Sequence, residues 1–184
     1  VNDVKYVRVM DWDVPFTEFS EHVTIRGTGT TTLLEKSHLD GFATADPLDA
    51  SCDATGCGFG GVDVDVTDAG PSDHGAYFRF NFGTIANGAE YTFRIFYGAT
   101  GDEASALAAM AAESVELFSL GQSSRTTDPA TTGDPALGTP ATFMFGFAGV
   151  GGTPVGRVPE PGSLALVALS LGLLGAGTLR RRRS

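Results

Sequence analysis

The sequence predicts a mainly β protein: an antiparallel β-sandwich with one alanine-rich helix, followed by a C-terminal transmembrane helix. Short segments in which apolar and polar residues alternate predict the strands, and turn-forming residues separate them. One internal segment has helical spacing instead, and the end of the chain contains an apolar run without a polar stripe. These three observations define the fold class.

The clearest strand signals lie on either side of residue 85. Aromatic and polar residues alternate over Tyr77–Phe82 and again over Tyr91–Tyr97, with Asn87 and Gly88 between them. An Asn-Gly pair suits a turn that needs positive φ, so we expect an antiparallel hairpin or meander. Further segments with strand character are Lys5–Val14, Phe19–Arg26, Thr31–Glu35, Val62–Thr67, Val115–Leu120 and Thr142–Phe147.

The predicted helix covers Asp102–Ser114. This segment is rich in alanine, begins with acidic residues and places Leu107 and Met110 at helical spacing. We expect its N-cap near Thr100 or Asp102. Residues 122–140, rich in Thr, Asp, Gly and Pro, predict a mobile loop, and the glycine-rich residues 148–157 predict a flexible linker.

The two cysteines, Cys52 and Cys57, predict a disulfide that closes a small loop in an oxidising compartment. The alternatives are a metal site and free thiols. Zinc normally takes four ligands, and neither a second cysteine pair nor a nearby histidine accompanies this pair.

An acidic segment follows the cysteines, with Asp63, Asp65 and Asp68, and Asp73 a little further on. If residues 62–67 form a strand, alternation puts the valines inward and the carboxylates in solvent. The alternative is that Asp63, Asp65, Asp68 and Asp73 bind Ca²⁺ through their oxygens, although the order of an EF-hand loop is absent. We therefore expect no obligatory cofactor, with Ca²⁺ as the one candidate ion.

A second acidic pair, Asp11 and Asp13, flanks Trp12. On a strand both carboxylates would share one face, an arrangement that glycoside hydrolases use in other contexts. Both belong to one short element, however, and no third group is evident to shift the pKa of either. Because no nucleophile elbow, zinc-protease helix or phosphate loop occurs, we expect no enzymatic activity.

The charge of the chain disfavours nucleic acid as a partner. It carries 12 Lys+Arg against 22 Asp+Glu, a net charge of −10, and four of the arginines are confined to residues 180–183. Nucleic-acid binding requires basic surface to neutralise phosphates. The body of the chain is therefore strongly acidic.

The C-terminal end has the features of a membrane-targeting segment. Residues 162–179 are uncharged and rich in Leu, Ala, Val and Gly, and as a helix they would span about 27 Å. Arg180, Arg181, Arg182 and Arg183 follow and should remain on the cytoplasmic side. The rest of the chain would then face outward.

Pro159, Glu160 and Pro161 precede this run, so that a Pro-Glu-Pro motif, an apolar span and a basic cluster follow in order. The tail, residues 158–184, resembles the PEP-CTERM sorting signal, which an exosortase recognises and cleaves. The resemblance implies a bacterial protein delivered to the inner membrane and then to the cell envelope or the extracellular space, in families linked to exopolysaccharide and biofilm. It implies no activity for the sorted domain.

Parts of the body also resemble other PEP-CTERM-sorted ectodomains of unassigned function. The segments concerned are Arg8–Val14, Tyr97–Ala99, Ser119–Gln122 and Phe145–Gly152. We accordingly expect one ectodomain over residues 1–147, the linker 148–157 and the sorting tail. Because an exported protein needs a signal peptide and the sequence starts at Val1, we expect that the precursor has a further N-terminal part.

The sequence as a whole predicts an exported structural or adhesive protein of the cell envelope, with an exosortase, the inner membrane and exopolysaccharide as partners. One alternative is a calcium-dependent glycan-binding module that uses exposed aromatic residues such as Trp12, Tyr77 and Phe96. The other is a glycan hydrolase that uses Asp11 and Asp13.

Overall fold

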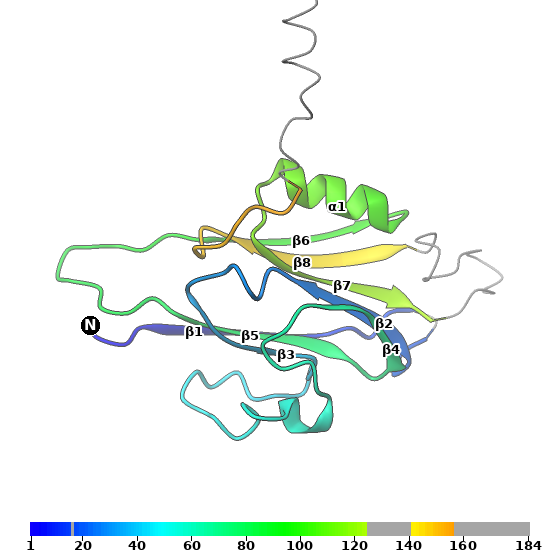
Figure 1. Ribbon diagram of the computed structural model, residues 1–184, viewed down its shortest axis with the longest axis horizontal. Helices are drawn as coiled ribbons and strands as arrows, with labels where there is room; N and C mark the ends of the chain where they lie inside the picture. Colours follow the sequence, from blue (N-terminus) through cyan, green and yellow to red (C-terminus); the bar gives the residue numbers. More distant parts are fainter. Residues whose placement is uncertain (16, 125–140, 157–184) are drawn as a thin grey trace, which may run out of the picture.

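The computed structural model describes residues 1–15, 17–124 and 141–156, which form two antiparallel sheets and, among these residues, a single α-helix (Figure 1). The three-stranded sheet has the order β1 (Lys5–Asp11), β5 (Gly75–Asn81), β3 (Leu34–His38). The five-stranded sheet has the order β4 (Val66–Ser72), β2 (Glu21–Arg26), β7 (Leu117–Ser123), β8 (Thr142–Ala148), β6 (Arg94–Thr100). The mainly β prediction is confirmed.

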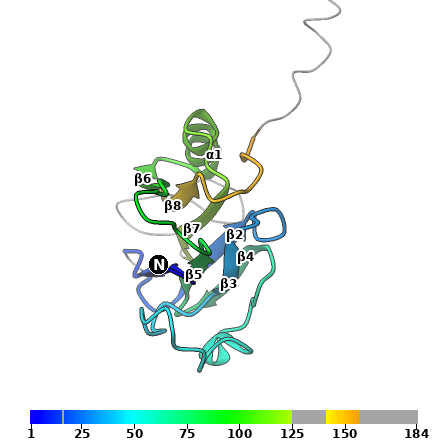
Figure 2. The same cartoon turned by 90° about the vertical axis from the view of Figure 1, so that its left-hand side faces the viewer.

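The core lies between the two sheets. Phe78 and Phe80 alternate along β5 and contact Phe145 and Phe147 of β8, with ring centroids 4.7 to 5.8 Å apart. All four side chains are fully buried, as are Val23, Ile25 and Leu117 of the five-stranded sheet. Figure 2, turned by 90° from Figure 1, shows the sheets as successive layers. Burial of these aromatic and aliphatic side chains is the main source of stability.

Each sheet also has its outer face covered. Helix α1 (Glu103–Ala112) packs Ala106 and Met110 against Phe118, Leu120 and Met144 of the five-stranded sheet (Figure 1). The prediction of this helix is confirmed, including its N-cap: the Asp102 side chain accepts a 2.7 Å hydrogen bond from the Ser105 amide. Alternate residues of β7 and β8 thus face the core and the helix, which explains why these strands are apolar on both sides.

The outer face of the three-stranded sheet is covered by the loop that follows β3, which contains the short 3-10 helix η1 (Gly56–Gly58). Cys52 and Cys57 form a disulfide in this loop, as the sequence predicted. The His38 and Tyr77 rings stack beneath it, with centroids 4.2 Å apart. Arg79 of β5 reaches into the loop and hydrogen-bonds both oxygens of Asp53, at 3.0 and 2.5 Å.

The prediction of a hairpin between residues 77–82 and 91–97 is wrong. β5 pairs with β1 and β3, while β6 pairs with β8 in the other sheet. Because both edges of β5 already have partners, no edge remains for β6. Phe82 and Phe93 do contact each other, but as stacked rings 5.2 Å apart and not as a strand pair.

Two strand positions are also corrected. The predicted strand Val62–Thr67 lies in the structure at Val66–Ser72, and Asp63 has a positive φ of 53° in the turn before it. The predicted strand Thr31–Glu35 lies at Leu34–His38. Val64 is 51 % exposed, so the expected inward valine face does not extend to residue 64.

Most of the expected linker, residues 148–157, is packed against the domain. Val150 is fully buried, and the Glu116 carboxylate accepts hydrogen bonds from the amides of Gly149, Val150 and Gly152. The Val155 amide donates to Val115 O, so residues 148–156 pack on the domain instead of forming a free stalk. In the expected mobile loop, Gln122 and Ser123 end β7, and residues 125–140 lie outside the described part.

The sorting motif Pro159–Pro161, the apolar run 162–179 and Arg180–Arg183 also lie outside the described residues. Within residues 1–15, 17–124 and 141–156, no helix has the length and apolar character needed to cross a membrane.

Candidate functional site

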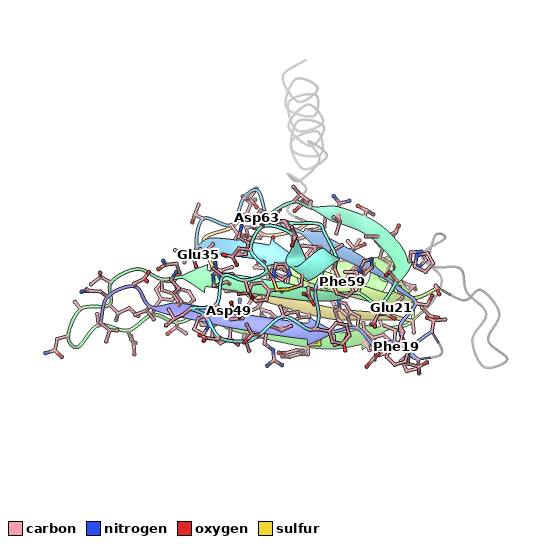
Figure 3. The ribbon with its side chains drawn as sticks, turned by 90° about the horizontal axis from the view of Figure 1, so that it is seen from below. Phe19, Glu21, Glu35, Asp49, Phe59 and Asp63 are labelled. Atoms are coloured by element: carbon pink, nitrogen blue, oxygen red, sulfur yellow. A yellow bond between two sulfur atoms is a disulfide. The ribbon has the colours of Figure 1, made fainter. Side chains whose placement is uncertain are left out.

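Three acidic residues from separate segments come together at one end of the sheets. Asp11 ends β1, Glu21 begins β2, and Asp73 lies in the turn between β4 and β5. One carboxylate oxygen from each lies within 4.8 Å of the others. We call these residues the acidic cluster. Figure 3 shows Glu21 near the end of the molecule that also carries Phe19.

Glu21 is the most buried member of the acidic cluster, with none of its surface exposed. Its two oxygens accept 3.0 Å hydrogen bonds from backbone amides, Oε1 from His74 and Oε2 from Ser20. Burial raises the pKa of Glu21 to about 7, and the nearby Asp73 carboxylate contributes in the same direction. The side chain is thus held in place while its charge is disfavoured.

Asp11 and Asp73 complete the cluster and are only partly exposed. Burial also raises the pKa of Asp11, with Asp13, Asp73 and Asp40 as further negative neighbours. Asp11 Oδ1 and Asp73 Oδ1 are both buried, and neither has a hydrogen-bond partner. These oxygens therefore lack the compensation that buried polar atoms normally receive.

A close backbone contact covers Asp11. The loop after β3 passes so near to the start of β5 that a side chain on Gly75 would overlap the backbone of Gly41. A Cβ atom on Gly41 would lie 2.9 Å from Asp11 Oδ1. Glycine at both positions lets this loop lie directly over the carboxylate.

Two histidines adjoin the cluster. His74 is 8 % exposed, burial lowers its pKa, and the Asp73 charge is the largest opposing influence. His22 follows Glu21, and the buried Nδ1 atoms of both rings have no hydrogen-bond partner. Of the side-chain atoms found buried and unpaired in the described residues, only Ser37 Oγ lies outside residues 11, 22, 73 and 74.

The structure does not bring together the four aspartates expected to bind Ca²⁺. Asp63 forms a 2.6 Å ion pair with Lys36, Asp65 accepts hydrogen bonds from Thr28, and Asp68 is bonded to Thr24. Figure 3 shows Asp63 well separated from Glu21. Of the four, only Asp73 lies within a group of potential ligands in the described residues.

The Asp11 and Asp13 pair is also arranged differently from the expectation. β1 ends at Asp11, and Asp13 is exposed beyond it. Trp12 is 6 % exposed and donates a 2.9 Å hydrogen bond to Ser119 Oγ, so it is a core residue. Tyr77 is 2 % exposed. The prediction of Trp12 and Tyr77 as exposed aromatic residues is wrong, while Phe96 remains partly exposed.

Sequence reasoning missed Glu21, although a signal was present. Glu21, Val23 and Ile25 alternate along the predicted strand, and both aliphatic residues point into the core. A glutamate in phase with buried Val and Ile residues is itself buried. Asp11 and Asp73 were candidates for two other sites, and their meeting with Glu21 could not be predicted, because the three residues come together only through the pairing of different strands.

A groove of about 220 Å³ lies between α1 and β6, away from the acidic cluster. Its lining is mostly apolar, with Glu113 as the charged residue. The lining residues include Phe96, Tyr97, Met110, Val115 and Met144. Because it gathers no set of titratable groups, the groove offers space without catalytic chemistry.

Comparisons with known proteins give no relative. The chain matches no protein-family model, no curated protein and no solved structure.

Proposed function

We propose that this chain is an exported structural or adhesive protein of the bacterial cell envelope, sorted by an exosortase that cleaves its PEP-CTERM-like tail. The observation that carries the proposal is the order of Pro159-Glu160-Pro161, the apolar residues 162–179 and the basic residues 180–183. The proposed architecture is a β-sandwich ectodomain, a short connection and a transmembrane helix over residues 162–179.

Features of the described domain fit an exported protein. The Cys52–Cys57 disulfide is typical of oxidising compartments outside the cytoplasm. The acidic composition favours solubility and repels nucleic acid. The last described residue, Gly156, precedes the Pro-Glu-Pro motif by only two residues, so the cleavage site would lie next to the folded domain.

The decisive experiment is the intact mass of the mature protein from its native host, compared with a strain that lacks its exosortase. We expect a C-terminus between Pro159 and Gly162 in the parent strain and an uncut tail in the deletion strain. Glu160→Gln should reduce cleavage, while Ser163→Ala, just beyond the motif, serves as the matched control. An uncut tail in both strains would reduce the segment to an ordinary membrane anchor.

A glycan-binding module is the second candidate, because Tyr97 on edge strand β6 is 54 % exposed. The Arg8 guanidinium lies 5.5 Å from the centre of its ring, which gives this surface an aromatic and a cationic group together. Calorimetric titration with exopolysaccharide from the host tests this candidate. Heat that disappears in Tyr97→Ala but persists in Tyr91→Ala, another exposed tyrosine, would support it.

The proposed role is not enzymatic. A hydrolase would need Asp11 and Asp13 to act on opposite sides of a glycosidic bond. The test measures hydrolysis of a panel of glycans by the parent protein and by Asp13→Asn. This substitution changes the exposed carboxylate and leaves the acidic cluster intact. Hydrolysis by the parent that is lost in Asp13→Asn would replace the structural proposal by the hydrolase.

A further inference from the structure

We propose that Asp11, Glu21 and Asp73 bind one Ca²⁺ ion that joins the two sheets at this end of the domain. The site differs from the aspartates that the sequence suggested and is independent of the sorting proposal. Its ligands come from β1, from β2 and from the turn that links β4 to β5, so the ion would connect elements of both sheets.

The first argument is charge. Three carboxylates with oxygens within 4.8 Å repel one another unless a cation or a proton compensates them. The described part of the chain contains six Lys and Arg residues, and each is engaged elsewhere. Lys5 and Arg79 pair with Glu35, Lys36 with Asp63, Arg94 with Glu113, Arg8 lies over Tyr97, and Arg26 bonds Thr67. The described residues thus supply no basic side chain to the cluster.

The second argument is independent of charge and concerns unpaired atoms. Asp11 Oδ1 and Asp73 Oδ1 are buried at the cluster without a hydrogen-bond donor. His74, whose backbone amide binds Glu21, is more than nine-tenths buried and has an unpaired Nδ1 beside the Asp73 charge. Buried polar atoms are normally paired, so the concentration of unpaired ones here points to a bound cation.

The ligand atoms select the class of ion. Carboxylate oxygens are hard ligands that suit Ca²⁺, and three carboxylates offer up to six oxygens to an ion that takes six to eight. No histidine nitrogen joins the group of ligand atoms within 4.8 Å in the described residues, which disfavours zinc. The amides of Ser20 and His74 hold Glu21 in position, as groups around a metal ligand commonly do.

The position of the only tryptophan allows a local measurement. Trp12 directly follows Asp11, so a Tb³⁺ ion that replaces Ca²⁺ should emit when the indole is excited. We would add Tb³⁺ to the full chain in detergent, displace it with Ca²⁺, and record thermal unfolding with EDTA, Ca²⁺, Mg²⁺ or Zn²⁺. We expect sensitised emission that Ca²⁺ removes, and a saturable rise in Tm that Ca²⁺ produces at lower concentration than Mg²⁺.

Asp73→Asn is the test variant and Asp65→Asn the matched control, since Asp65 is an exposed aspartate bonded to Thr28. Asp73→Asn should weaken Ca²⁺ binding by roughly tenfold or more, because the ligand charge falls. It should also raise Tm in EDTA, because it relieves repulsion, so a loss of binding cannot be attributed to misfolding. Asp65→Asn should bind Ca²⁺ as the parent does.

Three results would overturn the proposal. The first is a Tm that does not respond to Ca²⁺ up to about 10 mM, above the affinities of extracellular calcium modules. The second is an equal loss of Tb³⁺ emission in Asp65→Asn and Asp73→Asn. The third is a response to Zn²⁺ alone, which would assign the site to the neighbouring histidines. None of these results bears on cleavage of the tail.

Discussion

The Glu21 carboxylate accepts a 3.0 Å hydrogen bond from the backbone amide of His74. Glu21 begins β2 of the five-stranded sheet, and His74 immediately precedes β5 of the three-stranded sheet. The bond therefore joins the two sheets where the chain crosses between them. A fully buried acidic side chain takes a structural part in this connection, and its raised pKa predicts that the connection depends on pH.

The stability of the ion-free protein should fall as the pH rises from about 4.5 to 8. Glu21 has a pKa of about 7 in the fold, raised by burial from 4.5, so the folded state binds its proton more tightly than the unfolded state. The resulting stabilisation is complete below pH 4.5 and is lost as the pH passes through 7. It amounts to at most about 3 kcal/mol. Urea unfolding in EDTA at several pH values measures it.

Glu21→Gln provides the control for this pH dependence. Glutamine is neutral throughout, and its amide oxygen can retain one of the two hydrogen bonds. The variant should lose most of the decrease in stability between pH 5 and 8, although the shifted pKa values of neighbouring Asp11 and His74 contribute in the parent and the variant alike. An unchanged slope in the variant would assign the pH dependence to those neighbours and contradict the prediction.

Arg79→Met should destabilise the domain by about 3 kcal/mol. Arg79 is 5 % exposed and binds Asp53, Glu35 and the carbonyl of Asp49, so it attaches the disulfide loop to β5. Its removal leaves Asp53 without a partner, while Glu35 keeps Lys5, and because both carboxylates are about a quarter exposed we expect the lower end of the cost of breaking a buried ion pair. Urea unfolding gives the difference.

Arg94→Met is the matched comparison. The Arg94 and Glu113 side chains form a 3.4 Å ion pair with both partners more than half exposed, so its loss should change stability by less than about 1 kcal/mol. Equal effects of the two substitutions would mean that the buried position of Arg79 does not matter. Arg79→Lys should recover part of the loss, since lysine keeps the charge but cannot bind Asp53 through two nitrogens.

Gly121→Ala should destabilise the domain by about 1–3 kcal/mol. A Cβ atom at residue 121 would overlap the indole ring of Trp12, which is fixed by its hydrogen bond to Ser119. Gly101→Ala has open space around its Cβ atom and should have little effect. Chemical unfolding followed by the fluorescence of the single tryptophan compares them, and equal stability of both variants would contradict the close packing of Trp12 on β7.

The local structure could be predicted well and the long-range structure poorly, for a physical reason. Alternation located β5, and alanine content located α1, because both signals depend on neighbouring residues. Alternation does not identify the pairing partner of a strand. The sequence therefore predicted the wrong partner for β6, which pairs with β8. The acidic cluster requires three strand ends to meet. Only the buried position of Glu21, in phase with Val23 and Ile25, was readable in advance.

Removal of the disulfide should destabilise the domain by about 2 kcal/mol. Closing the short loop between Cys52 and Cys57 restricts the unfolded chain, and the conformational entropy that the unfolded chain loses is small for so few residues.

The same loop carries Asp53, which binds Arg79, so the disulfide also holds that carboxylate in position. The Cys52→Ser, Cys57→Ser double variant and Arg79→Met should therefore be non-additive when combined, costing less together than the sum of their separate effects. Urea unfolding of the four proteins measures this coupling, and dithiothreitol should destabilise the parent while leaving the double variant unchanged. Additive effects would show that the loop holds Asp53 without the disulfide.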